Sequence, residues 1–174
     1  MLIAKKLPSE KQRKDPLWII IVSIVIASIL VVYPMSYAIA GWRPLYMFLI
    51  MLFWVLCQPT WCGIWFAFTL GLFTDLLLDA PLGMNALSYV LIAFLTRYFI
   101  RERRVLTFSN LWVITMLAIL AHLTFTFMAQ VMAGTHFSIT RHWQTLISSI
   151  FCWPILYYLL KRWRESVQAP KLIK

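Results

Sequence analysis

Charged residues are scarce in this sequence. Asp, Glu, Lys and Arg make up 13% of the 174 residues, whereas hydrophobic residues make up 62%. A soluble domain usually has about a quarter of its residues charged and about half apolar. Because one compact core of this size could not enclose the excess of apolar side chains, much of the apolar surface should face lipid. The composition therefore predicts one membrane domain and argues against a separate soluble domain.

Cysteine is also sparse, with three residues in the whole chain. Cys57 and Cys62 are five positions apart, which is not the two-residue spacer of a zinc site or a thioredoxin-type site. Cys152 lies far from both in the sequence. We therefore expect these cysteines to be small buried hydrophobic residues, and we expect neither a metal nor a cofactor.

Sequence motifs for catalysis are missing as well. There is no nucleophile elbow, phosphate-binding loop or HExxH metal motif. Asp75 follows Gly-Leu-Phe-Thr and not the Gly-x-Gly of intramembrane aspartyl proteases. His122 stands alone in an apolar run, where a hydrogen bond between helices is the common role. The chain is expected not to be an enzyme, and an intramembrane hydrolase that uses Asp75 and His122 is the least favoured alternative.

Apolar runs predict an all-helical integral membrane protein with six transmembrane helices, at about residues 17–39, 45–57, 63–78, 86–100, 111–133 and 143–160. The second run alone would reach only about 20 Å, so its helix should begin near Trp42 or end near Pro59. Six spans place most Lys and Arg residues in the cytoplasm together with both termini, and leave only Arg43 and Arg141 outside. A re-entrant hairpin over residues 45–78 would leave all later loops on the same sides of the membrane as two full spans would. Counting charges in the loops therefore cannot distinguish the hairpin from two spans.

The two ends of the chain are basic. We expect a cytoplasmic arm at residues 1–16, the six-helix domain at 17–160, and a cytoplasmic tail at 161–174. No cleavable signal peptide is expected, because no short apolar core is followed by a small-residue cleavage site. Basic side chains near the membrane surface are expected to bind anionic lipid rather than nucleic acid. The expected anchors are Lys11, Arg13, Lys14, Arg97, Arg101, Arg104, Lys161 and Arg162.

The third predicted helix carries a residue pattern with a period of four: Gly63, Ala67, Gly71, Asp75 and Asp79. Small residues at this spacing allow the backbone of another helix to approach closely. The pattern predicts a helix–helix interface along this ridge. It does not distinguish an interface within the molecule from one between proteins.

The two aspartates of this ridge have different expected roles. A carboxylate inside a span costs about 2.5–3.5 kcal/mol, so Asp75 should make a specific contact. Asp79 begins Asp-Ala-Pro, a turn signal, and is expected to cap that turn. Arg43, at the outer start of the second helix, is the nearest candidate partner. We predict an ion pair between Arg43 and either Asp75 or Asp79.

Two segments, WRPLYMFLIMLFWVL and GIWFAFTLGLFTDLLLDAPLGMNALSYVLIAFL, resemble the rod-shape-determining MreD family. The resemblance is strongest over residues 42–95 and rests on Arg43-Pro44, Gly71, Asp75, Leu82-Gly83 and the run at 86–89. Asp79 departs from the family, where a small residue is expected. The candidate residues for partner or structural contact are therefore Arg43, Pro44, Gly63, Ala67, Gly71, Asp75, Asp79, Leu82 and Gly83.

The resemblance implies a non-enzymatic scaffold of the cell-elongation machinery, in the bacterial inner membrane. It implies MreC, MreB and the pair of RodA with a class B penicillin-binding protein as partners. It also implies a fold similar to the six-helix substrate-binding subunits of energy-coupling-factor (ECF) vitamin transporters. That similarity supplies the alternative function, a subunit that binds a vitamin or another small molecule for transport.

Overall fold

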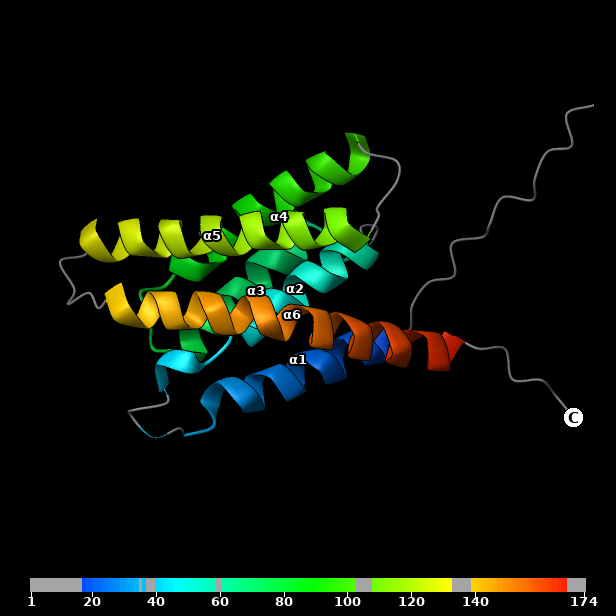
Figure 1. Ribbon diagram of the computed structural model, residues 1–174, viewed down its shortest axis with the longest axis horizontal. Coiled ribbons are helices and arrows are strands. Elements are labelled where there is room, and N and C mark those ends of the chain that lie inside the picture. Colours follow the sequence, from blue (N-terminus) through cyan, green and yellow to red (C-terminus); the bar gives the residue numbers. More distant parts are fainter. Residues whose placement is uncertain are drawn as a thin grey trace, which may run out of the picture.

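Within the residues that the computed structural model describes, six α-helices run back and forth along the long axis of the molecule (Figure 1). The structure describes residues 17–34, 36, 40–58, 61–102, 108–132 and 139–168. Within these residues every regular element is a helix, as predicted. The start of the first helix and the end of the last lie at the same end of the bundle, on the right in Figure 1. The helices are α1 (Leu17–Val32), α2 (Tyr46–Cys57), α3 (Ile64–Leu77), α4 (Met84–Glu102), α5 (Phe108–Met132) and α6 (Ile139–Gln168), with a short 3-10 helix η1 (Ala40–Trp42) before α2.

Helix α2 is the buried centre of the bundle. Every residue from Met47 to Leu56 is buried, and α2 contacts α1, α3, α4 and α6. Its sequence, YMFLIMLFWVLC, is hydrophobic all round, and such a helix is buried on all sides. Its apolar side chains therefore face other helices.

The prediction that this second helix begins near Trp42 or ends near Pro59 is wrong. Residues 43–45 are not helical, and α2 ends at Cys57. Its 12 residues span about 18 Å, less than the hydrocarbon core of about 30 Å. Because its neighbours enclose α2, its ends need not reach the two surfaces of the bilayer.

Helices α1 and α6 differ in length from their predicted spans. Helix α1 ends at Val32 because Pro34 disfavours the helical conformation at the residue before it, Tyr33. Helix α6 continues to Gln168 and includes Pro154 within its length. The first part of the expected basic tail, residues 161–168, is therefore an extension of α6.

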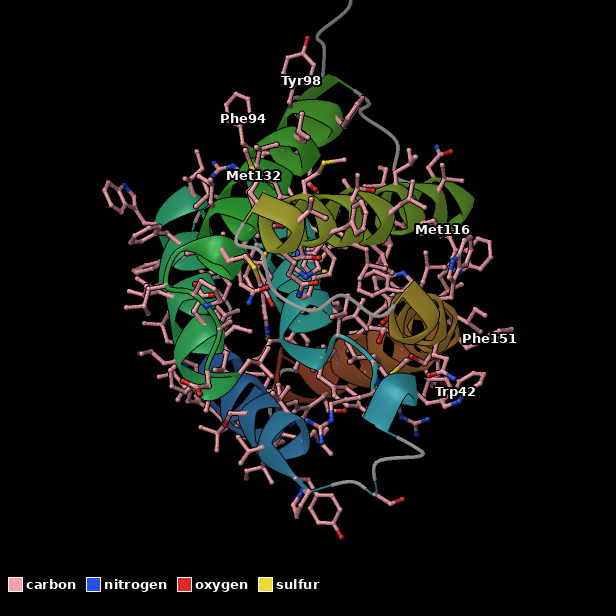
Figure 2. All side chains as sticks on the ribbon, turned by 90° about the vertical axis from the view of Figure 1, so that its left-hand side faces the viewer. Trp42, Phe94, Tyr98, Met116, Met132 and Phe151 are labelled. Carbon is pink, nitrogen blue, oxygen red and sulfur yellow. The ribbon has the colours of Figure 1, made fainter. Side chains whose placement is uncertain are left out.

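Large apolar side chains cover the outward faces of the bundle. Phe94, Tyr98, Met116 and Phe151 are exposed and point away from the helices (Figure 2). Two stretches, Asn110–Met132 in α5 and Trp143–Val167 in α6, are long and apolar enough to cross a membrane. An exposed apolar surface of this extent marks contact with lipid or another protein. These features indicate a membrane protein.

Candidate functional site

The turn that joins α3 to α4 is held by the carboxylate of Asp75. Its Oδ2 accepts hydrogen bonds from the backbone N–H groups of Gly83 (2.9 Å) and Ala86 (3.4 Å), and Oδ1 accepts one from Asn85 (2.9 Å). Asp75 lies in the last turn of α3 and has no exposed surface. Its carboxylate is therefore satisfied by backbone donors at the start of the next helix.

These three donors lie where a helix start leaves N–H groups without a partner in the helix. The carbonyl of Gly83 accepts the first hydrogen bond of α4, from the N–H of Leu87 (2.9 Å), so Gly83 is the N-cap residue. Glycine has no side chain with which to cap, and Asp75 supplies the missing acceptor from α3. A carboxylate is also favourable beside the positive end of the helix dipole. Asp75 thereby joins the end of α3 to the start of α4.

Asp79 lies just beyond the end of α3, in the turn. Leu78 is the C-cap of α3, and Asp79 has a left-handed backbone conformation with a φ of 51°. The N–H of Ala80 donates to the carbonyl of Asp75 (3.0 Å), the 6→1 bond of a Schellman motif. Asp79 is exposed and occupies the turn position that its Asp-Ala-Pro sequence predicted.

The predicted ion pair between Arg43 and Asp75 or Asp79 is wrong. The Arg43 guanidinium donates instead to the backbone carbonyls of Val31 (2.5 Å) and Tyr33 (2.6 Å), at the C-terminal end of α1. A cation is favourable at that end of a helix, where the carbonyl groups lack partners. Arg43 therefore fixes the end of α1, whereas Asp75 fixes the start of α4.

The ridge of small residues on α3 packs against α4, within the molecule. A Cβ atom at Gly71 would lie 2.4 Å from the Cα atom of Ala86 and 2.8 Å from its nitrogen. A Cβ atom at Gly63 would lie 2.7 Å from Nη1 of Arg97, also on α4, and Ala67 between the two glycines is buried. The interface that the sequence left open is therefore an internal contact between neighbouring helices.

Leu82 and Pro44 are two further candidate contact residues that lie outside the helices and reach the surface. Leu82, in the turn between α3 and α4, is 69% exposed. Pro44 is half-buried and lies just before α2. Leu82 thus stands on a turn whose backbone is fixed by Asp75.

We predict that Gly83→Ala lowers the free energy of unfolding by about 1–2 kcal/mol, because an L residue is disfavoured at positive φ. The φ of Gly83 is 97°, and no atom lies within 4 Å of an added Cβ, so the cost should be backbone strain alone. Thermal unfolding of the purified protein in detergent would measure it. An unchanged melting temperature would contradict the strained geometry, and a loss above about 4 kcal/mol would indicate a steric clash as well.

Some of the predicted membrane-surface anchors are described by the structure. Lys161 and Arg162 are exposed on the last part of α6, and Arg97 is half-buried beside Gly63. Arg101 lies on α4. Lys11, Arg13, Lys14 and Arg104 lie outside the described residues.

His122 forms the predicted hydrogen bond between helices. Its Nδ1 lies 2.7 Å from Oγ of Ser88 on α4, and its ring stacks on Phe48 of α2 with centroids 4.6 Å apart. Sequence reasoning missed Ser88 and Asn85. Ser88 and Thr96 follow Asn85 by three and eleven positions, a spacing that places the three polar residues on one face of a helix. All three are buried.

Metal binding finds no support among the described residues, where no three His, Cys, Asp or Glu side chains are grouped to hold an ion. The polar groups of the site are instead used to join helices. The hydrogen bonds of Asp75 hold the turn between α3 and α4 in one conformation at one end of the bundle.

Comparison with known proteins gives the family. The chain matches the family model described as rod shape-determining protein MreD over residues 12–163, which includes α1 to α5 and most of α6. It is 31% identical over 159 residues to the rod shape-determining protein MreD of Haemophilus influenzae, and the match covers 87% of this chain and 94% of that protein. No solved structure matches the chain. The chain belongs to the rod shape-determining MreD family.

Proposed function

We propose that this protein is a non-enzymatic scaffold of the machinery that builds the cell wall during rod-shaped growth. Membership of the family supports a role in rod-shape determination. The observation that carries the scaffold role is the use of Asp75. An intramembrane hydrolase would need this carboxylate at its reacting centre, whereas here three backbone N–H groups occupy both of its oxygen atoms.

The proposed location is the bacterial inner membrane, with six passes and with both termini in the cytoplasm. The alternating direction of the helices supports this topology, because the start of α1 and the end of α6 lie at one end of the bundle (Figure 1). The exposed Lys161 and Arg162 near the end of α6 fit a cytoplasmic surface rich in anionic lipid. The turn with Asp79 and Leu82 then lies at the outer surface.

This turn is the proposed surface for a protein partner. Asp75 and the positive φ of Asp79 and Gly83 fix the backbone, so the exposed Leu82 is presented without a large loss of conformational entropy on binding. Candidate partners, by family resemblance, are MreC, MreB and RodA with its class B penicillin-binding protein. The alternative of a vitamin-transport subunit gains no support from the comparisons, and a fold like that of ECF subunits remains part of the proposal.

The test is cell shape after depletion of the protein in its native bacterium. We expect the rods to become round and wild-type protein to restore them. Leu82→Ser, at equal membrane level, should fail to restore the rods because the partner loses an apolar contact. Leu17→Ser should restore the rods. It makes the same change at an exposed leucine at the start of α1, about 21 Å along the helix from the Arg43 contact at Val31.

Cells that stay rod-shaped on depletion would overturn the scaffold role, and a loss of vitamin uptake in those cells would favour the transport alternative. Normal shape with Leu82→Ser, alongside rounding on depletion, would keep the scaffold role and move the partner surface away from this turn.

A further inference from the structure

A cavity of about 200 Å³ lies beside the site, between the start of α2 and helices α3 to α6. Its wall carries polar groups from five parts of the chain. These are the side chains of Arg43, Thr74, Asn85, His122 and Thr145, together with two tyrosines. No carboxylate is among the described residues that line it, so the wall carries one positive charge and no negative one.

Arg43 is incompletely satisfied at this wall. Its two terminal nitrogens donate to the carbonyls of Val31 and Tyr33, which are neutral acceptors. Its Nε is buried and has no hydrogen-bond partner. Buried N–H groups are nearly always paired in native structures, and buried charges usually have an ionic partner. Arg43 therefore retains both an unused donor and an unneutralised charge.

Asn85 is the second polar residue of this wall that can donate hydrogen bonds to a ligand. The residue is 5% exposed, and its backbone N–H is bound by Oδ1 of Asp75. The residue also lines the cavity. A carboxamide can donate two hydrogen bonds and accept others. Arg43 and Asn85 come from separate parts of the chain and line one small space, at which Arg43 has an unused donor.

We propose that this cavity binds a compact oxyanion, the carboxylate or phosphate group of a small ligand, with Arg43 as the charge partner and Asn85 as a hydrogen-bond donor. Guanidinium groups bind these oxyanions through charge-assisted hydrogen bonds. The cavity is smaller than the pockets of about 300–1,000 Å³ that enclose drug-sized ligands, so it suits a headgroup-sized anion. The proposal goes beyond the scaffold role and does not depend on it.

Two sources could supply such a group, a soluble anion or the phosphate of a lipid headgroup. The test uses purified full-length protein in an uncharged detergent. The probes are inorganic phosphate and acetate, each compared with chloride at equal ionic strength, and phosphatidylglycerol compared with phosphatidylcholine. At about ten times its dissociation constant, a bound probe should raise the melting temperature by about 3–6 °C. The probe that acts identifies the source.

Asn85→Ala and Arg43→Gln should each abolish the rise in melting temperature that the bound probe produces. Arg43 also holds the end of α1, so Asn85→Ala keeps the test decisive if Arg43→Gln fails to fold. The control is Arg164→Gln, which removes the same charge on α6 about 28 Å along the helix from Thr145 in the cavity wall. This control should keep the full rise.

The proposal is overturned if phosphate, acetate and phosphatidylglycerol all raise the melting temperature no more than chloride and phosphatidylcholine do. It is equally overturned if Asn85→Ala and a folded Arg43→Gln both keep the probe-induced rise in melting temperature. The same holds if Arg164→Gln loses as much of this rise as those two variants do.

Discussion

Replacing Asp75 by alanine should lower the free energy of unfolding by about 4 kcal/mol, because hydrogen bonds to a charged group contribute about 1.5–3 kcal/mol each. Two N–H groups lie 2.9 Å from the carboxylate and a third lies at 3.4 Å, and the substitution leaves all three at the start of α4 without an acceptor. Since Asp75 has no exposed surface, water can replace it only at some structural cost. For a chain of this length the melting temperature should fall by about 10 °C.

Asp75→Asn should be less damaging than Asp75→Ala but well below wild type. The amide keeps one acceptor oxygen, whereas its NH2 group would face a backbone N–H that now binds the second carboxylate oxygen. Asp79→Asn is the matched control, because it makes the same chemical change one helical turn later. Asparagine tolerates the left-handed conformation of residue 79, where φ is 51°. The melting temperature of the Asp79→Asn protein should therefore hardly change.

Thermal unfolding in detergent, followed by tryptophan fluorescence, measures all three variants. An Asp75→Ala protein that melts within about 2 °C of wild type would contradict the capping role, since it implies a loss below about 1 kcal/mol. An Asp79→Asn protein that loses as much as Asp75→Asn would mean that the effect follows from charge alone.

The number of α-helices in the described part of the chain was predictable from the sequence, but their burial was not. Apolar runs predict helices whether their side chains meet lipid or protein, because both environments favour the same residues. Helix α2 shows this limit. Its all-apolar sequence fits a lipid-facing span, and only the packing of α1, α3, α4 and α6 around it reveals a buried central helix.

The partner of Asp75 was wrongly predicted for a related reason. Topology brings Arg43 and Asp75 to the same end of the bundle, and opposite charges are the obvious pair. The true donors are backbone N–H groups, which every residue except proline carries and which therefore leave no signature in the sequence. One signal was available, because Gly83 precedes α4 without a capping side chain, so the acceptor had to come from elsewhere.

The spacing of small residues was more informative. It predicted a close helix contact along Gly63, Ala67 and Gly71, and the structure identifies α4 as the neighbour. The sequence could not name that neighbour, since Ala86 contributes its backbone to the contact and not a distinctive side chain.

Gly71→Ala should be as damaging as the loss of Asp75, with a cost of about 3 kcal/mol or more, the upper end of overpacking effects. The added Cβ would lie 2.4 Å from the Cα of Ala86 and 2.8 Å from its nitrogen, and neither atom can move without displacing α4. A displaced α4 would also pull its first N–H groups away from Asp75. Thermal unfolding should therefore show a melting temperature lower by about 6–12 °C.

Two further variants test whether the contact is between backbones. Gly63→Ala should melt within about 2 °C of wild type, because its Cβ would meet Nη1 of Arg97, the end of a flexible side chain that can move aside. Ala86→Gly should not rescue Gly71→Ala, since the atoms in the way are the Cα and nitrogen that glycine also has. Rescue by Ala86→Gly would show instead that the methyl group of Ala86 limits the approach of α3, and equal damage from Gly63→Ala would show that the whole ridge is intolerant of a Cβ atom.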